Sequence, residues 1–228
     1  MTRDVGVVIV AGGSSTRTAG EELKQFRWVS GKPMLLHSLQ AFMARPDVVS
    51  VVCVVPPQYV ADPPPWIFQC DVDRLLLSVG GRTRTESARH GLEDLPNEAQ
   101  IALVHDAARP LVEVGLVDRV VAAARAGECA VPGLPVADTI KEADDSGCVA
   151  RTLDRTKLWR VQTPQGFPRE ILERAHREAR AANVTATDDA ALCERLGIPV
   201  RIVPGSERAM KVTHEEDFVR VEAYFASR

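Results

Sequence analysis

Small and basic residues lie together close to the N-terminus. The sequence from Ala11 to Arg17 is AGGSSTR, and Lys24 follows seven residues later. A loop of small residues after a strand can turn its backbone N–H groups toward an anion, and Arg and Lys side chains can then reach phosphate oxygens. The alternative is a plain glycine-rich turn with solvated basic side chains, and this segment alone favours phosphate binding only slightly. The loop matches neither GxxxxGK[ST] nor GxGxxG, which rejects a P-loop and weakens the case for NAD.

A second candidate segment is HDAARP, from His105 to Pro110. A carboxylate at the end of a strand, here Asp106, can hold substrate hydroxyls or a phosphate-bound Mg²⁺. Arg109 can bind a phosphate. The alternative is a strand-end turn in which Asp106 and Arg109 form a local ion pair. His105 by itself is expected to be a packed structural histidine rather than a catalyst.

Five further segments carry polar residues of the same kinds. They are DTIK (138–141), Asp154-Arg155, QTPQGF (162–167), TDDA (187–190) and MKVT (210–213). Each also has an ordinary structural explanation. Thr187 or Asp188 could cap a helix, residues 162–167 could form a turn, and Lys211 could be a solvated strand residue. Taken singly, each segment favours the structural explanation.

The elements that must position these residues alternate along the chain. Continuous apolar runs separated by helical spacing predict an α/β fold, a mostly parallel twisted sheet flanked by helices, in a single domain over residues 1–228. The expected strands are 5–11, 48–55, 75–79, 101–105, 128–131 and 200–203, and the expected helices are 33–44, 83–95, 114–126, 168–182, 188–196 and 214–225. Ligands of such sheets bind at the carboxyl ends of the strands. The loops 12–30, 80–87 and 106–110 should therefore form the site.

Residues 134–157 interrupt this alternation. Two short strand-like pieces flank the polar turn sequence ADDSG at 143–147. Such a cluster is typical of a tight turn between antiparallel strands. We therefore expect a β-hairpin arm that projects from the domain.

Composition and charge limit the other functions. The net charge of −3 gives no electrostatic reason to expect nucleic acid or an anionic membrane as a partner. The five cysteines have no spacing typical of a zinc site and are expected to be reduced, mostly buried thiols. We find no apolar stretch of about 20 residues and no signal-peptide pattern, so the expected location is cytoplasmic.

Taken together, the segments resemble the 2-C-methyl-D-erythritol 4-phosphate cytidylyltransferases, also called 4-diphosphocytidyl-2-C-methylerythritol synthases. AGGSSTR with Lys24, GGRTRTES, VHDAARP, DTIK, LDR, QTPQGF, TDDA and MKVT occur in the family's order and at similar spacing, from about Val7 to the C-terminal helix. The resemblance implies a Rossmann-like nucleotidyltransferase fold, CTP as the donor and a methylerythritol phosphate as the acceptor. It also implies a divalent cation, normally Mg²⁺, and a homodimer formed through the 134–157 arm.

The resemblance assigns roles by position. Arg17 and Lys24 would stabilise charge on the α-phosphate, and Arg155 and Lys211 would position the acceptor. The nucleotide would be held by Ala11, Gly12, Gly13, Ser14, Ser15, Gly81, Arg82, Ser87, Asp106 and Ala107. The acceptor site would comprise Asp106, Arg109, Thr139, Arg155, Thr163, Thr187 and Lys211. Mg²⁺ would be held mainly by the CTP phosphates, with Asp106 as a candidate ligand. In the family the arm swaps across the dimer, so Thr139 and Arg155 would serve the partner's site.

The sequence departs from the family pattern at three positions. Gly12 stands where the family usually has Ala, and Ser15 stands where it has Gly. Ser15 must then accept a backbone conformation that Gly adopts at little cost. Leu23 stands where a Pro commonly precedes the catalytic Lys. We expect an altered loop shape and a more mobile Lys24 loop.

Three other functions remain as alternatives. Ribitol 5-phosphate cytidylyltransferase shares the chemistry and differs in the acceptor. A non-catalytic nucleotide-sensing module could share the fold, although it would not need both Arg17 and Lys24. An NAD-dependent oxidoreductase lacks its glycine fingerprint here. The absence of a convincing Ser, Cys or His nucleophile agrees with a reaction in which the acceptor's phosphate is itself the nucleophile.

Overall fold

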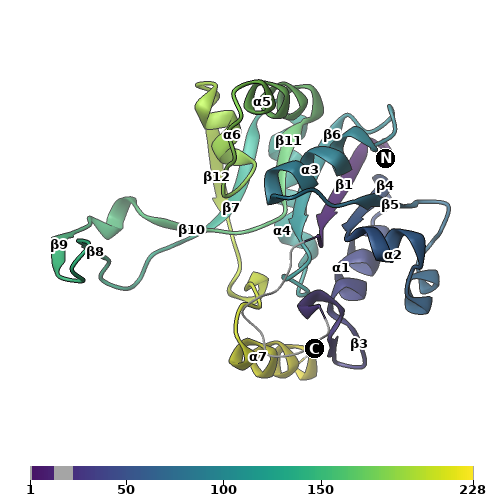
Figure 1. Cartoon of the computed structure of the whole chain (residues 1–228), viewed down its shortest axis with the longest axis horizontal. Helices are drawn as coiled ribbons and strands as arrows, with labels where there is room; N and C mark the ends of the chain where they lie inside the picture. The colour runs from purple at the N-terminus through teal and green to yellow at the C-terminus, as the bar shows by residue number, and fades with distance from the viewer. Residues whose placement is uncertain (1, 13–22, 228) are drawn as a thin grey trace.

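The computed structural model describes residues 2–12 and 23–227. Within them, one mixed sheet has the strand order β10-β7-β11-β6-β1-β4-β5, and β12 pairs with β7 (Figure 1). The strands of this sheet are β1 (Val5–Val10), β4 (Val48–Val55), β5 (Leu75–Val79), β6 (Ile101–Asp106), β7 (Cys129–Pro135), β10 (Trp159–Val161), β11 (Gln165–Pro168) and β12 (Val200–Pro204). The β5-β4-β1-β6 half is entirely parallel. This is the predicted α/β fold with a mostly parallel sheet.

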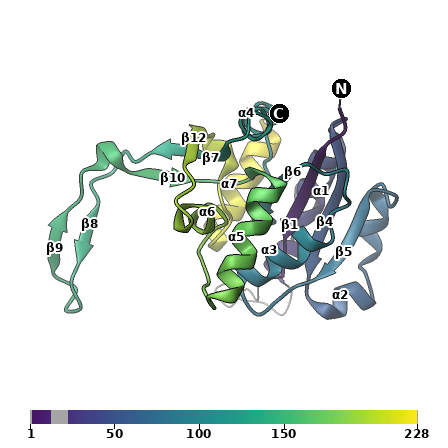
Figure 2. The ribbon, with the colours of Figure 1, turned by 90° about the horizontal axis from the view of Figure 1, so that it is seen from above.

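Helices cover both faces of the sheet, as Figure 2 shows. On one face, α1 (Met34–Met43) and α4 (Val114–Arg125) pack against the side chains of Val7 and Ile9. On the other face, α3 (Arg84–Glu93), α5 (Arg169–Ala181) and α6 (Ala190–Arg195) pack around Val8. Successive side chains of a strand point to opposite faces, so one apolar run supplies both cores.

The C-terminal segment folds back to the N-terminal third of the chain. Helix α7 (Glu215–Ala226) contributes Phe218 and Val221 to a small core that also holds Val29 and Met34, beside the short strands β2 (Trp28–Val29) and β3 (Lys32–Pro33). Arg27 forms an ion pair with Glu215 at 2.5 Å. These contacts fix the segment just before α7 against the carboxyl ends of the strands.

The structural explanation considered for residues 162–167, a turn, is wrong. Gln165–Pro168 forms β11, which lies antiparallel to β6 and beside β7 near the middle of the sheet. A Cβ atom on Gly166 would come within 2.4 Å of Val120 Cγ1, so the closely packed α4 leaves no room for a side chain there. The strand has only four residues, QGFP, and these do not show the apolar alternation from which strands are predicted.

Two other segments expected to be irregular contain short elements. The polar loop expected up to about residue 30 includes a 3₁₀ turn (Lys24–Phe26) and β2. The connection expected at 59–69 begins within α2 (Pro57–Ala61) and ends in a 3₁₀ helix (Pro65–Gln69). None of the helices in the described part of the chain is both long and apolar enough to cross a membrane.

The predicted hairpin is present and projects from the domain (Figures 1 and 2). β7 leads out, β8 (Lys141–Ala143) and β9 (Val149–Thr152) pair antiparallel, and β10 returns. Asp144 closes the turn, because its Oδ1 accepts hydrogen bonds from the backbone N–H groups of Ser146 and Cys148, both at 2.9 Å. Every residue of β8 and β9 is exposed.

Candidate active site

The carboxyl ends of β1, β4, β5 and β6 lie at one edge of the sheet. The Ala11 N–H donates to Val54 O at 2.8 Å, the Gly80 N–H to Val55 O at 2.8 Å, and the Ala107 N–H to Val10 O at 3.2 Å. These bonds continue the parallel ladders beyond the strands. They place the first residues of the three loops named from the sequence at one edge, where ligands of this fold class bind.

Gly12 and Gly80 lie against each other in this edge. A Cβ atom on Gly12 would stand 3.3 Å from Gly80 Cα and 3.4 Å from Ser87 Oγ, which is tight but not closed to alanine. Ser87 is buried, and its hydroxyl accepts from the Gly81 N–H at 3.0 Å and donates to Thr83 O at 2.9 Å. Gly12 of the first loop and Gly80 and Ser87 of the second loop therefore form one surface of small residues.

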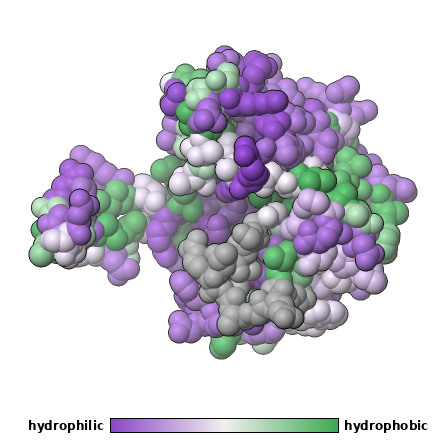
Figure 3. All heavy atoms as spheres, in the orientation of Figure 1, coloured by the Kyte–Doolittle hydropathy of each residue, from purple (hydrophilic) through white to green (hydrophobic). Residues whose placement is uncertain are grey.

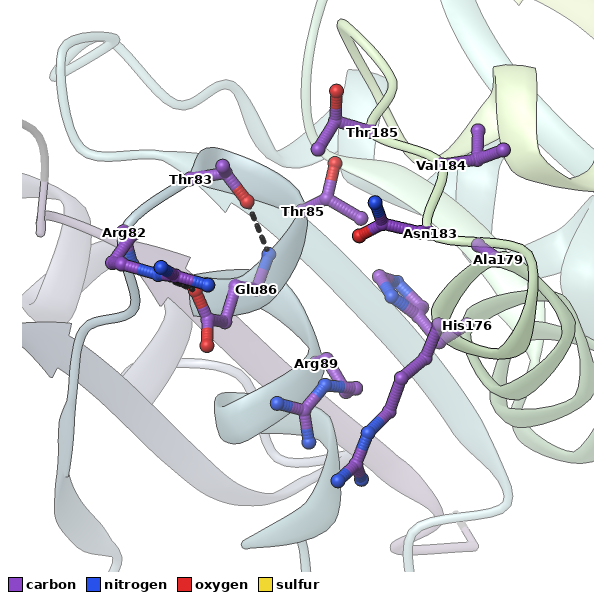
Figure 4. Close-up of a pocket in the computed structure, with 11 residues that line it drawn as sticks. Arg82, Thr83, Thr85, Glu86, Arg89, His176, Ala179, Asn183, Val184 and Thr185 are labelled. Carbon is purple, nitrogen blue, oxygen red and sulfur yellow. Dashed lines mark hydrogen bonds and ion pairs between the residues drawn. The ribbon is translucent and has the colours of Figure 1, made fainter.

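Arg82 lies differently from its neighbours. Its side chain is 96% exposed, its N–H donates to Glu86 Oε2 at 2.8 Å, and its guanidinium also faces Glu86. It borders a separate groove of about 530 Å³ between α3 and the C-terminal end of α5 (Figure 4). The contact that the structure gives Arg82 is thus with Glu86, not with Gly12 or Ser87.

Asp106, the last residue of β6, has a cation on each carboxylate oxygen. Arg84 Nε donates to Oδ1 at 3.2 Å, and Lys211 Nζ donates to Oδ2 at 2.7 Å. Burial would raise the pKa of the Asp106 carboxyl, but Arg84 and Lys211 together hold it well below its usual range. The local Asp106–Arg109 ion pair considered from the sequence is not formed.

Arg109 instead binds backbone carbonyl groups of two other segments. Its guanidinium donates to Ala209 O at 2.6 Å and to Val161 O at 3.4 Å. Burial lowers its pKa, although Asp106 opposes that shift. Arg109 therefore adds positive charge beside Asp106 and ties the 106–110 loop to the segment that precedes Lys211.

His105 and Thr163 form the buried support beneath Asp106. His105 Nε2 donates to Arg109 O at 3.1 Å, its Nδ1 lies 3.1 Å from Thr163 Oγ1, and the Asp106 N–H donates to the same hydroxyl at 3.1 Å. Burial lowers the pKa of His105 to about 4, so the ring is neutral near pH 7. The expectation of a structural histidine agrees with these contacts. Thr163, expected in the acceptor site, is itself buried and holds the Asp106 backbone.

Lys24 meets the C-terminal segment at this edge. Its Nζ donates to Val212 O at 2.7 Å, one residue from Lys211. The Val212 N–H in turn donates to Ala108 O at 2.8 Å. The neighbouring Gln25 is buried and donates to Ala11 O at 2.5 Å. Lys24 thus binds the segment that carries Lys211, although the two lysines lie 187 residues apart in the sequence.

Within the described residues, the single chain does not bring Thr139, Arg155 or Thr187 to this cluster. Gly13, Ser14, Ser15 and Arg17 lie outside the described residues. Thr139 and Arg155 are exposed on the arm, where Arg155 donates to Ala137 O. Thr187 is exposed, and its neighbour Asp188 caps α6 by accepting from the Ala191 N–H at 3.0 Å.

Sequence reasoning assigned no role to Arg84 or Asp189. Arg84 Nη1 donates to Asp189 Oδ2 at 2.7 Å, and His176 Nε2 lies 2.9 Å from Asp189 Oδ1. Burial would raise the pKa of Asp189, but Arg84 and His176 keep it lowered. The segment TDDA contained one signal of the role of Asp189. A single aspartate is enough to cap a helix, so the second aspartate of the pair had no structural explanation.

The donor set suits a metal ion only in part. Residues 2–12 and 23–227 contain no group of three or more His, Cys, Asp or Glu that could hold an ion. Asp106 is a single carboxylate with cations on both oxygens. Mg²⁺ is commonly bound by one or two carboxylates together with substrate phosphates and water. The residues present therefore fit an ion whose ligands come mainly from a triphosphate.

Comparison with known proteins agrees with the geometry. The model of the 2-C-methyl-D-erythritol 4-phosphate cytidylyltransferase family matches residues 5–227. The enzyme of that name from Desulforamulus reducens is 37% identical, over 99% of this chain and 97% of its own length. A bifunctional IspD/IspF enzyme from Solidesulfovibrio magneticus is 44% identical over 92% of this chain, which spans only 54% of that relative.

Solved structures show the same fold. The crystal structure of 2-C-methyl-D-erythritol 4-phosphate cytidylyltransferase from Thermus thermophilus superposes with a TM-score of 0.82 at 38% identity, covering 97% of this chain and 98% of that one. A structure titled 4-diphosphocytidyl-2C-methyl-D-erythritol synthase gives 0.80 at 30% identity, covering 99% of this chain and 100% of that one. Both the sequence matches and the superpositions run almost end to end. The chain belongs to the 2-C-methyl-D-erythritol 4-phosphate cytidylyltransferase family.

Proposed function

We propose that this protein transfers CMP from CTP to 2-C-methyl-D-erythritol 4-phosphate, giving 4-diphosphocytidyl-2-C-methyl-D-erythritol and pyrophosphate, a step in isoprenoid precursor synthesis. Family membership supports the reaction. The observation that carries it is the meeting of two lysines at the carboxyl ends of the strands: Lys24 binds the backbone of Val212, and the adjacent Lys211 binds Asp106.

The chemistry requires cations more than it requires a base. An oxygen of the acceptor's phosphate forms a bond to the α-phosphorus of CTP, and the bond from that phosphorus to the bridging oxygen breaks, so pyrophosphate leaves with the electron pair. The nucleophile is already an anion, but it must approach another anion. At about 4 Å each pair of unit charges repels by ~4 kcal/mol at an effective dielectric constant near 20. Positioned cations remove this obstacle.

The chain's cations can be given separate tasks. Lys24, with Arg17, would stabilise the charge on the α-phosphate. Lys211 would bind the phosphate of the acceptor. Asp106 would accept hydrogen bonds from hydroxyl groups of the acceptor or nucleotide, as ionised carboxylates do. Gly12, Gly81 and Ser87 would line the pocket for the base, with the Ser87 hydroxyl holding the Gly81 N–H.

Mg²⁺ would complete the site. Bound mainly by the triphosphate oxygens, with Asp106 as the candidate protein ligand, it would neutralise phosphate charge. The proposed residue roles above do not depend on a protein cage for the ion.

The dimer would complete the acceptor site. Thr139 and Arg155 are exposed on an arm that extends away from the Asp106 cluster of their own chain (Figure 1). The arm and its base also expose Val149, Trp159 and Val161. Apolar side chains without a covering layer are typical of protein interfaces. A second copy of the chain would cover them and receive Thr139 and Arg155 in its site. A cytoplasmic location accords with five cysteines, none of which forms a disulfide.

Pyrophosphate release tests the function. The enzyme is assayed with CTP and Mg²⁺ and either methylerythritol phosphate, ribitol 5-phosphate or no acceptor. We expect release that depends on the methylerythritol phosphate. Release with ribitol 5-phosphate alone would move the protein to the alternative acceptor, and thermal stabilisation by CTP without turnover would support a sensing module.

A further inference from the structure

Four residues link the interior of the domain to Lys211. His176 on α5 contacts Asp189, Asp189 contacts Arg84 at the start of α3, and Arg84 contacts Asp106, which also binds Lys211. The successive distances are 2.9, 2.7, 3.2 and 2.7 Å. The side chains at the interior end are 2% exposed for His176 and 1% for Asp189, whereas Lys211 at the other end is 46% exposed. One end is thus fixed in the core and the other faces solvent.

In the proposed reaction Lys211 binds two groups in turn, the Asp106 carboxylate and the phosphate of the acceptor. It is bound to Asp106 here, but its proposed task is to hold the phosphate of the acceptor. The Asp106 side chain is only 13% exposed. A carboxylate this buried is strongly disfavoured when its only counter-ion is removed. Something else must keep Asp106 in place if Lys211 moves to the substrate.

We propose, on the basis of the proposed function, that Arg84 is a positioning residue that holds Asp106 in place while Lys211 transfers from Asp106 to the phosphate of the acceptor. Arg84 contacts the other carboxylate oxygen, so the departure of Lys211 leaves this contact intact. Lys211 is the more exposed of the two cations and the one free to move, because its side chain is 46% exposed and that of Arg84 is 22% exposed.

Arginine suits this position for a geometric reason. Its Nε faces Asp106 while its Nη1 faces Asp189, so one rigid guanidinium spans two carboxylates. Asp189 is itself held, because Gln165 Oε1 accepts from the Asp189 N–H at 3.1 Å and His176 contacts its other oxygen. The orientation of Arg84 is therefore set by the core and not by the ligand. A lysine could neutralise Asp106 but could not span both carboxylates.

A matched control lies on the same helix. Arg89 is also on α3 and is partly buried, but its guanidinium pairs with Glu93 at 2.7 Å and borders the groove beside His176 (Figure 4). Replacing Arg89 removes a charge and an ion pair from α3 without touching Asp106. Arg84→Gln and Arg89→Gln therefore differ in the contact at issue.

The test is a double-mutant cycle between positions 84 and 211. For Arg84→Gln we expect KM for the acceptor to rise about tenfold, with KM for CTP changed less than about twofold. Arg84→Lys should recover part of the loss, and Arg89→Gln should match the wild type. In a Lys211→Ala background the effect of Arg84→Gln should largely disappear, because there is no transfer of Lys211 left to support. Melting temperatures would identify any variant that has lost its fold.

Two results would overturn the inference. One is an Arg84→Gln loss that appears equally in both KM values or is no larger than that of Arg89→Gln. The other is full additivity of the losses at 84 and 211. Calorimetric titration with methylerythritol phosphate gives the same comparison without turnover. If the proposed function is wrong, the wild type will show no turnover with CTP and the acceptor. If only this inference is wrong, the wild type will turn over and Arg84→Gln will bind the acceptor as tightly as the wild type.

Discussion

The end of β6 and the β8–β9 arm both carry residues predicted to bind the acceptor, and the two regions hold them in opposite ways. At the end of β6, Asp106 is ion-paired on both oxygens and Thr163 lies buried beneath it. On the arm, Thr139 and Arg155 are exposed, and β8 and β9 contain no buried residue. Figure 3 shows the arm extending to one side of the main domain, whose surface carries both hydrophilic and hydrophobic residues.

This difference separates two sources of order. Side chains at the end of β6 are positioned by packing and hydrogen bonds within the chain. The arm buries too little apolar surface for a rigid position of its own, since an isolated two-stranded hairpin is marginal in water. The arm residues are therefore expected to become positioned only when a second chain covers them. Four experiments test whether the two regions differ in this way.

The largest effect is expected in the body. Lys24→Ala should lower kcat by about 100- to 1000-fold, with a much smaller rise in KM for CTP, because Lys24 acts mainly on charge that develops in the transition state. Steady-state kinetics measures both constants. Lys32→Ala is the control, because Lys32 contacts Gln40 and not the site. A change confined to KM would assign Lys24 to ground-state binding of CTP.

Mixing variants tests whether the arm serves the partner. Subunits with Lys24→Ala and subunits with Arg155→Ala should each be nearly inactive alone. Random exchange should restore about a quarter of the wild-type activity, since half of the dimers would be mixed and each would contain one intact site. Activity is followed after the subunits are unfolded together and refolded. Mixtures no more active than the separate variants would place Arg155 in its own chain's site or outside any site.

Stability should distinguish the two regions by several kcal/mol. Phe167 is fully buried on β11, and Phe167→Ala should lower the free energy of unfolding by about 3–5 kcal/mol. Val149 on the arm is 61% exposed, and Val149→Ala should change it by less than about 0.5 kcal/mol in the monomer. Urea denaturation at low and high protein concentration measures both. A Val149→Ala cost that grows with concentration would show that a second chain covers the arm.

The smallest expected effect is a difference in the rates at which the thiols are labelled. Cys148 at the tip of the arm is exposed, whereas the other four cysteines are buried, and burial raises the pKa of Cys70 to about 11. A maleimide should modify Cys148 first in the native protein, as peptide mass spectrometry would show. Labelling should slow as the concentration rises if the arm packs on a partner. Equal labelling of Cys148 and Cys193 would mean that the body opens as readily as the arm.

Much of the fold and the family could be predicted from the amino-acid sequence. Continuous apolar runs such as 48–55 predict buried parallel strands, because a strand that is covered on both faces has no polar side. The turn residues at 143–147 predict the hairpin for an equally local reason. The order of motifs identified the family, and with it Lys24, Asp106 and Lys211. Each of these inferences depends on residues that are close in the chain or on a pattern of short segments.

The contacts between distant side chains could not be predicted in this way and became visible in the folded structure. Strand β11 was missed because Gly166 has no side chain to show a period, and its place is fixed by Val120 on α4. Arg84 gained its role through Asp106 and Asp189, which lie 22 and 105 residues away in the sequence. Hydrogen bonds and ion pairs depend on distances of a few ångström, and local propensity carries no information on contacts between residues so far apart. The sequence supplied the charged groups, and the packing of α3, α5 and the sheet determined their partners.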